Sequence, residues 1–183
     1  TMALVDTIYP KAIAKAISDG KVTCMMGIAP LYENILELFD YNSEFDISSL
    51  RIPESGGMFT RSALMERFRQ RFGVGIIPVW GSTETTGIAI ANRPGQGIVP
   101  GSIGRPCASY EVKIIDEFGV EAGIGEAGEM AFKGPAVVNG YYEDNGRVNR
   151  SFRDGWYFSG DIGRKDGEGN FYFVDRKSGM LKV

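Results

Sequence analysis

The placement of glycine and proline divides this 183-residue chain into two stretches of different character. Glycine contributes 25 residues, about twice its usual share, and glycine and proline become dense after residue 92. Before that point, helix-forming runs alternate with short apolar runs, which predicts a partial, mainly parallel sheet with flanking helices. Afterwards, short strand patterns separated by turn residues predict a small antiparallel β-barrel. We therefore expect an α/β subdomain over residues 1–95 and a β-barrel subdomain over residues 96–175.

The first stretch carries the signals of helices that alternate with strands. Pro10 stands at the favoured first position of a helix, and Thr60 is the expected N-cap of a later helix that Gly73 ends. A helix between them is expected over residues 31–39. Strands are expected over residues 22–29, 50–52 and 76–79, the first of them buried on both faces because its apolar run does not alternate. The barrel strands are expected over residues 111–115, 129–133, 156–159 and 171–175.

Composition excludes several classes of function. The chain is 43% hydrophobic and 23% charged, as ordinary globular proteins are, and its net charge of −3 argues against binding to nucleic acid or an anionic membrane. Histidine is absent, which excludes Ser–His, Cys–His and histidine–metal chemistry. Cys24 and Cys107 have no neighbours at metal-ligand spacing. We expect a reduced, cytoplasmic protein with no signal peptide and no membrane span.

Two glycine-rich segments resemble ligand-binding motifs but have simpler interpretations. Residues 123–128 fit G-x-G-x-x-G, yet a strand pattern follows where the dinucleotide motif needs a helix, so we interpret them as a turn. Residues 166–170 resemble the start of a calcium loop. Phe171 stands where that loop requires glycine and Lys177 where it requires an acid, so a hairpin turn is predicted instead.

Polar residues follow the third expected strand, where ligands of open α/β sheets bind. Trp80 offers a flat face for a base, Gly81 lets a ligand approach the backbone, and Thr83 offers a hydroxyl to phosphate. Glu84 is a hard oxygen ligand of the kind that Mg²⁺ prefers. The alternative interpretation is a polar turn that carries one core tryptophan.

A second polar segment lies at the end of a barrel strand. Asp161 follows Ser-Gly and can accept the two hydrogen bonds that a ribose diol donates, and Arg176 can donate to ribose or phosphate oxygens. The alternative interpretation is an ion pair between these two residues within the barrel.

Five ordered segments together resemble the adenylate-forming superfamily, which includes AMP-forming acyl-CoA synthetases, luciferases and peptide-synthetase adenylation domains. The segment WGSTE at residues 80–84 resembles its Y/W-G-x-T-E motif. The others are SGGM at residues 55–58, the GE, GP and GYY groups within residues 128–142, DGWYFSGD at residues 154–161, and FVDRKSGMLKV at residues 173–183, which is similar to the family's hinge.

The resemblance implies a two-step reaction of fatty-acid metabolism. A carboxylate attacks the α-phosphorus of ATP to give acyl-AMP and pyrophosphate, and coenzyme A then takes the acyl group. The carboxylic acid, ATP or AMP, Mg²⁺ and coenzyme A are thus the implied ligands. A carboxylate is already an ionised nucleophile, so positioning and charge neutralisation can supply the catalysis without histidine.

The resemblance also implies which residues contact the nucleoside. Gly56, Gly57 and Met58 would line the adenine and acyl pocket, and Trp80 would stack on adenine, next to Gly81. Met58 replaces the small alanine of the family motif, which is expected to narrow or reshape the acyl pocket.

The remaining implied roles concern phosphate, metal, ribose and the second half-reaction. Thr83 would contact the α-phosphate and Glu84 would hold Mg²⁺. Asp161 would bind the ribose hydroxyls and Arg176 the ribose. Lys182 matches the lysine associated with the transfer to the thiol.

The chain departs from the family pattern at its ends. Nothing resembles the upstream phosphate loop, and residues 176–183 begin a hinge motif without a following lid. Ser178 and Gly179 differ from the family hinge. We expect a fragment of an acyl-CoA synthetase that lacks N- and C-terminal parts of its own chain and is inactive alone. The alternatives are an adenylation domain that loads a carrier protein, a non-catalytic adenylate-binding module, and a barrel without a ligand.

Overall fold

The computed structural model describes residues 2–41, 44–142 and 151–178. The chain divides into two compact units, Thr1–Pro78 and Val79–Val183. The division falls earlier than the expected subdomain boundary after residue 95. The strands that follow it contribute Ala89 and Ile90 to the apolar core of the second unit, so they group with that unit.

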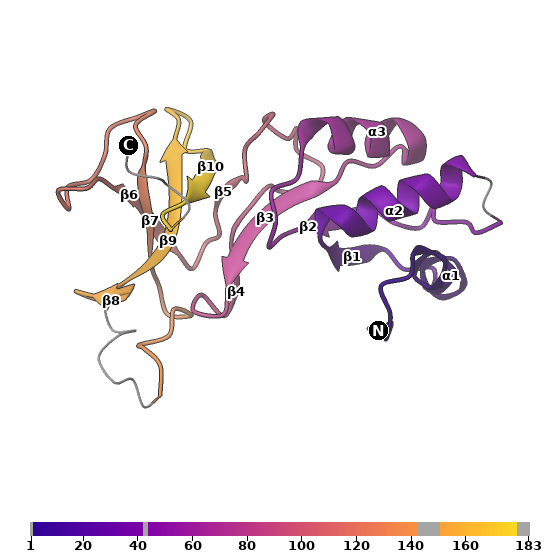
Figure 1. Ribbon diagram of the computed structural model, residues 1–183, viewed down its shortest axis with the longest axis horizontal. Helices are drawn as coiled ribbons and strands as arrows, with labels where there is room; N and C mark the ends of the chain where they lie inside the picture. The colour runs from indigo at the N-terminus through magenta and orange to yellow at the C-terminus, as the bar shows by residue number, and fades with distance from the viewer. Residues whose placement is uncertain (1, 42–43, 143–150, 179–183) are drawn as a thin grey trace. The chain divides into compact units, whose positions relative to one another are not determined.

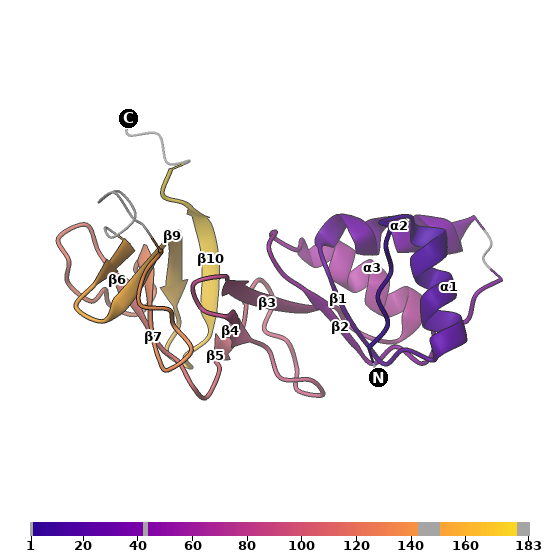
Figure 2. The same cartoon turned by 90° about the horizontal axis from the view of Figure 1, so that it is seen from below.

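The first unit has the alternating order that the sequence predicts (Figure 1). Its described elements are α1 (Pro10–Gly20), β1 (Cys24–Gly27), α2 (Ala29–Asp40), β2 (Ile52–Ser55), α3 (Ser62–Phe72) and the first residues of β3 (Ile77–Ser82). β1 pairs with β2 and β2 with β3, both in parallel. Figure 2 shows α1, α2 and α3 gathered beside β1 and β2.

Tyr32 holds the core of this unit together. Its ring is fully buried and packs edge-on against Phe68 with 5.4 Å between ring centroids, which joins α2 to α3. Its hydroxyl donates to the carbonyls of Met25 on β1 and Glu54 on β2, at 3.0 and 2.6 Å. Burial is the main reason that the pKa of Tyr32 lies well above its usual value.

Two expectations for the first unit are wrong. β1 is not buried on both faces: Cys24 is exposed and Met26 is 53% exposed. β1 is the edge of its sheet among the described strands, so it lacks the cover that a central parallel strand has. Thr60 is also not the N-cap of α3, which is Arg61. The Thr60 hydroxyl instead donates to Ser55 Oγ at 2.7 Å.

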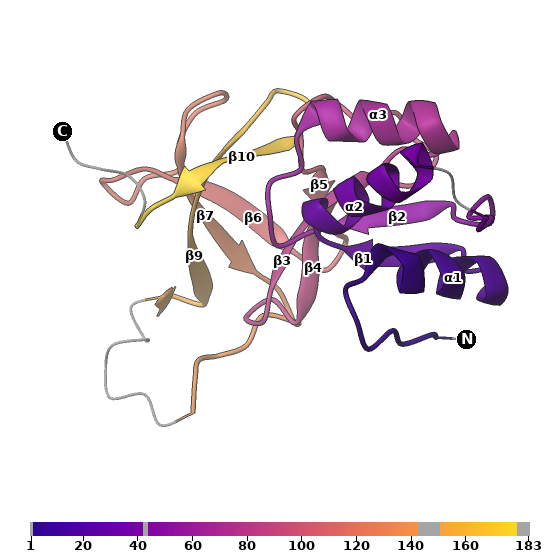
Figure 3. The same ribbon diagram turned by 45° about the vertical axis from the view of Figure 1, so that its right-hand side comes forward.

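The second unit is built from antiparallel strands. Besides the end of β3, its described strands are β4 (Gly87–Ala91), β5 (Arg105–Pro106), β6 (Glu111–Ile115), β7 (Gly128–Lys133), β8 (Phe152–Arg153), β9 (Trp156–Lys165) and β10 (Phe171–Arg176). β3, β4 and β5 pair antiparallel, so the first sheet joins the expected parallel strands to antiparallel ones. The second sheet has the order β10-β9-β7-β6 and curls into a half-barrel (Figure 3).

The two glycine-rich segments that resemble ligand-binding motifs, residues 123–128 and 166–170, contain turns, as predicted. Residues 123–127 form the turn before β7, in which Glu126 N donates to Gly123 O and Gly125 has a φ of 84°. Asp166 holds the β9–β10 hairpin by accepting hydrogen bonds from the backbone N–H groups of Glu168 and Asn170, both at 2.9 Å.

None of the helices in the described part of the chain has the length and apolar character that a membrane span requires.

Gly81 allows the close approach of β3 and β4. The strand register shifts between Trp80 and Gly81, and a Cβ atom at Gly81 would lie 2.3 Å from the carbonyl oxygen of Gly87. This contact is with backbone, which cannot swing aside. The structure therefore gives Gly81 a folding role in addition to the ligand approach that the sequence predicts.

We predict that Gly81→Ala destabilises the chain by about 1–3 kcal/mol, because the added methyl group forces β3 and β4 apart. Gly97→Ala is the matched control, since a Cβ atom there meets nothing within 4 Å. Urea denaturation of both variants measures the effect. Equal midpoints for the two variants would contradict the steric argument.

Candidate functional site

Trp80 lies on β3 beside its register shift against β4, and two other strands contact its side chain. Its indole stacks on Phe132 of β7, with 4.1 Å between ring centroids and 2° between the planes. Its Nε1 donates to Asp161 Oδ2 at 2.8 Å, and the residue is only 9% exposed. Because Phe132 covers one face of the indole, an adenine base would have to stack on the opposite face.

Asp161 on β9 is a buried carboxylate with one incompletely satisfied oxygen. The residue is 4% exposed, and Oδ2 accepts the hydrogen bond from Trp80. Arg176 Nε lies 2.8 Å from Oδ1 and forms an ion pair with it. The geometry is not that of a hydrogen bond, so Oδ1 has no hydrogen-bond donor among the described residues. The predicted ion-pair alternative is present, and it leaves an acceptor for a further donor.

Burial disfavours the ionised form of Asp161, and two neighbouring residues favour it. Desolvation raises the pKa of this carboxyl above its usual value. The hydrogen bond from Trp80 and the charge of Arg176 act in the opposite direction, and the charge of Glu129 adds to the rise. The Arg176 side chain is 65% exposed, so it is free to adjust its contact with the carboxylate.

The turn at residues 83–86 joins β3 to β4 and carries two of the predicted residues. Thr83 is exposed at its start. Thr85, which the sequence reasoning missed, is fully buried; its hydroxyl donates to Gly87 O at 2.8 Å and accepts from Ser82 N at 2.9 Å. Tyr110 Oη donates to Thr85 O at 2.5 Å, so a side chain from outside the turn also holds its backbone.

Glu84 is half-buried and has an aromatic partner. Tyr141 Oη donates to Glu84 Oε1, and Val138 N donates to the Glu84 carbonyl at 2.9 Å. Tyr157, also missed by the sequence reasoning, lies close by. Burial raises the pKa of Tyr157 to about 12; a hydrogen bond with Ser82 opposes this rise and the charge of Glu84 adds to it.

Glu84 fits a magnesium ion only together with other ligands. Within the described part of the chain, no group of three or more acidic, histidine or cysteine residues is placed to hold a metal. Protein-bound Mg²⁺ commonly takes one or two carboxylates and fills its octahedron with water and substrate phosphates. A single carboxylate beside an exposed threonine suits an ion that arrives with a nucleotide.

Three further predicted site residues belong to the first unit. Gly56, Gly57 and Met58 follow β2 in the first unit; Gly56 N donates to Gly27 O at 3.1 Å, Gly57 has a φ of 73°, and the Met58 side chain is exposed. Lys182 falls outside the described residues.

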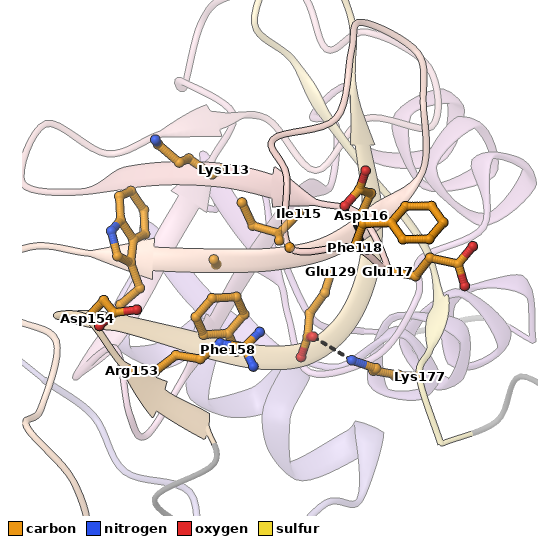
Figure 4. Close-up of a pocket in the computed structure, with 13 residues that line it drawn as sticks. Lys113, Ile115, Asp116, Glu117, Phe118, Glu129, Arg153, Asp154, Phe158 and Lys177 are labelled. Atoms are coloured by element: carbon orange, nitrogen blue, oxygen red, sulfur yellow. Dashed lines mark hydrogen bonds and ion pairs between the residues drawn. The ribbon is translucent and has the colours of Figure 1, made fainter.

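A pocket of about 620 Å³ lies on the face of the second sheet opposite to Trp80 and the apolar core (Figure 4). The sequence did not predict it. Aromatic rings covered by cations form much of its lining. The guanidinium of Arg153 lies 3.7 Å from the Phe158 ring centroid, and Lys113 Nζ lies 5.2 Å from that of Trp156. Glu129 and Lys177 join at its edge. None of the predicted nucleotide contacts lines this pocket.

The sequence matches the family model of AMP-binding enzymes over residues 1–142. The chain belongs to this family. A long-chain-fatty-acid–CoA ligase of Salmonella typhimurium is 32% identical over 171 residues, which cover 93% of this chain and 30% of the ligase. A feruloyl-CoA synthase of Amycolatopsis is 31% identical over 182 residues, covering 99% of this chain and 37% of the synthase.

Solved structures of the family have the same fold. The anthranilate–CoA ligase AuaEII in complex with anthranoyl-AMP superposes with a TM-score of 0.90 at 31% identity, over 100% of this chain and 35% of that one. The O-succinylbenzoate–CoA synthetase of Bacillus subtilis in complex with ATP and magnesium superposes with a TM-score of 0.82 at 28% identity, over 94% of this chain and 35% of that one. The resemblance to the adenylate-forming superfamily is therefore confirmed. The chain spans about a third of the length of these relatives.

We predict opposite effects of pH for two aspartates. The folded-state pKa of Asp161 is raised, so its ionisation opposes folding; Asp161→Asn should stabilise the chain at pH 7, and this gain should vanish below the unfolded value near 3.8. Hydrogen bonds from Asn170 are the main cause that lowers the pKa of Asp166 to about 2. Asp166→Asn should therefore destabilise at pH 7, with a loss that fades between pH 4 and 2.

Urea denaturation of both variants between pH 2 and 7 measures these two trends. The asparagine at 161 keeps an oxygen for Trp80 Nε1, so the comparison isolates the charge. A loss of stability in Asp161→Asn at pH 7 would show that Arg176 and Trp80 more than offset the burial of the carboxylate.

Proposed function

We propose that this chain supplies nucleotide-contacting residues of an AMP-forming acyl-CoA ligase. Such an enzyme activates a carboxylic acid with ATP to acyl-AMP and transfers the acyl group to coenzyme A. Family membership and the names of the relatives support the class of reaction. The observation that carries the assignment to residues is the buried Asp161 Oδ1, which lacks a hydrogen-bond donor among the described residues beside Trp80 and Arg176.

The adenosine contacts follow from the chemistry of this cluster. A ribose hydroxyl that donates to Asp161 Oδ1 would form a charge-assisted hydrogen bond, which is stronger than a neutral one. Burial strengthens it further, because little water competes for the carboxylate. Trp80 lies next to this acceptor with its plane fixed by Phe132. The pair thus offers a stacking surface and a diol acceptor side by side.

The phosphate contacts would come from the turn at residues 83–86. Thr83 can donate a hydroxyl to a phosphate oxygen, and Glu84 can bind a nucleotide-borne Mg²⁺ ion. The metal would neutralise charge on the phosphates as a Lewis acid. The turn is anchored by Thr85 and Tyr110. The backbone that carries Thr83 and Glu84 is therefore held in place before a ligand binds, which favours electrostatic stabilisation.

The class of acid and the acceptor rest on the relatives. Their names include long-chain fatty acids, ferulate, anthranilate and benzoate, which share a carboxylate and differ in the remainder. Coenzyme A as the acceptor is likewise proposed from those names. Inactivity of this chain by itself stays a prediction.

We predict that the chain binds AMP and that Trp80→Ala weakens binding by about 1–3 kcal/mol, the scale of base–aromatic stacking. Calorimetry gives the affinity, and the quench or enhancement of tryptophan fluorescence gives an independent signal. Trp156→Ala is the control, because Trp156 lines the pocket on the other face of the sheet. Unchanged affinity in Trp80→Ala would remove the stacking role.

We predict that Mg²⁺ strengthens ATP binding through Glu84. Glu84→Gln keeps the shape and the acceptor for Tyr141 but loses the charge, so the gain in ATP affinity on adding Mg²⁺ should fall about tenfold, as for a lost charge contact. Glu117→Gln, an exposed carboxylate of the other pocket, is the control. The same Mg²⁺ dependence in both variants would exclude Glu84 as a metal ligand.

A further inference from the structure

Glu129 on β7 makes two contacts with one carboxylate. Oε1 accepts a hydrogen bond from Gly160 N at 3.0 Å, and Oε2 accepts one from Lys177 Nζ at 2.7 Å. The Glu129 side chain is 11% exposed. Figure 4 shows it reaching toward Lys177 at the edge of the pocket. The partners precede Asp161 and follow Arg176 directly in sequence.

Glu129 approaches these neighbours from the face of the sheet opposite to the Asp161 side chain. Met130 and Phe132 on β7 face the apolar core, where Phe132 stacks on Trp80, the partner of Asp161. Glu129 instead lines the pocket on the opposite face of the sheet, as Figure 4 shows. It therefore leaves the core-facing side of Asp161 open to other contacts.

The backbone just before Asp161 is irregular, so groups from outside the regular strand pairing hydrogen-bond to it. Gly160 has a φ of 73°, and the register of β9 against β7 shifts across it, between Glu129 and Ala131. A second shift, between Phe173 and Asp175 on β10, lies opposite Ile162 and Gly163. At such shifts the regular ladder of backbone hydrogen bonds is interrupted. The Glu129 carboxylate takes the Gly160 N–H, and Gly160 O accepts from Lys177 N at 2.8 Å.

We propose that Glu129 is a positioning residue of the nucleotide site. By holding the N–H of Gly160 and the ammonium of Lys177, it fixes the backbone that carries Asp161 and the chain that carries Arg176. This inference rests on the proposed function, in which those two residues contact ribose. The hydrogen bond to Gly160 is the main contribution, because Lys177 is 62% exposed and an exposed ion pair is weak.

The test compares the affinity of the full chain for AMP with its affinity for 2′,3′-dideoxy-AMP. In Glu129→Ala and Glu129→Asp no acceptor reaches Gly160 N, so the preference for AMP should fall about tenfold. Glu129→Gln keeps an oxygen at the required length and should keep the preference. Lys177→Met removes only the ion pair, and its effect should stay under about threefold.

The order of the variants separates positioning from a general structural or charge role. A charge role would be preserved by Asp and lost with Gln, which is the reverse order and would overturn the proposal, as would a wild-type preference in Glu129→Asp. General destabilisation weakens both ligands equally and leaves their ratio unchanged. If Glu129→Ala fails to fold, Glu129→Asp and Glu129→Gln still decide.

A matched control is Glu121, whose carboxylate also holds two cations, Lys113 at 3.2 Å and Lys165 at 2.8 Å. Glu121→Asp should leave the AMP preference unchanged. A wild-type chain that binds both nucleotides equally would overturn the ribose contact of Asp161, and this inference with it. Loss of preference in Asp161→Ala together with a retained preference in Glu129→Asp would overturn only the role of Glu129.

Discussion

The hydrogen bond from Trp80 Nε1 to the buried carboxylate of Asp161 joins β3 to β9, and the candidate site of the second unit is arranged around it. Burial of the carboxylate raises its pKa, so the ionised form is held at a cost. Trp80 and Arg176 offset part of that cost but leave Oδ1 without a hydrogen bond among the described residues. A fold selected for stability alone would complete such a group or replace it. A buried, incompletely paired charge beside a fixed aromatic ring is what a site that awaits a ligand presents.

The backbone around this carboxylate is irregular where the site requires it. Gly81 allows β3 and β4 to approach closely behind Trp80, and Gly160 takes a positive φ just before Asp161. Both glycines sit at register shifts of their strands. Shifts of this kind redirect side chains out of the regular alternation of a strand. The site is thus placed by departures from ideal sheet geometry.

The elements with strong local signals could be predicted, and those decided by tertiary partners could not. Pro10 and Gly73 mark their helices because proline and glycine act through the backbone itself. Thr60 was wrong as an N-cap because α3 begins one residue later than expected, with Arg61 at the N-cap, and the Thr60 hydroxyl donates to Ser55 instead. The mixed character of the first sheet depends on how β3 turns back into β4, which apolar periodicity does not encode.

The same limit applies to the site. The motifs identified Trp80 and Asp161, which the structure joins by a hydrogen bond. No role was predicted for Thr85, or for Glu129 of the GE group, because their roles come from contacts with backbone groups, and no pattern of residue types records such contacts. Two consecutive basic residues, Arg176 at the end of β10 and Lys177 just after it, are the sequence feature related to these contacts. Side chains there alternate between faces, so Arg176 reaches Asp161 on the core face and Lys177 reaches Glu129 on the other. Each acid thereby gains its own cation, and the two faces of one strand end are electrostatically coupled through adjacent residues.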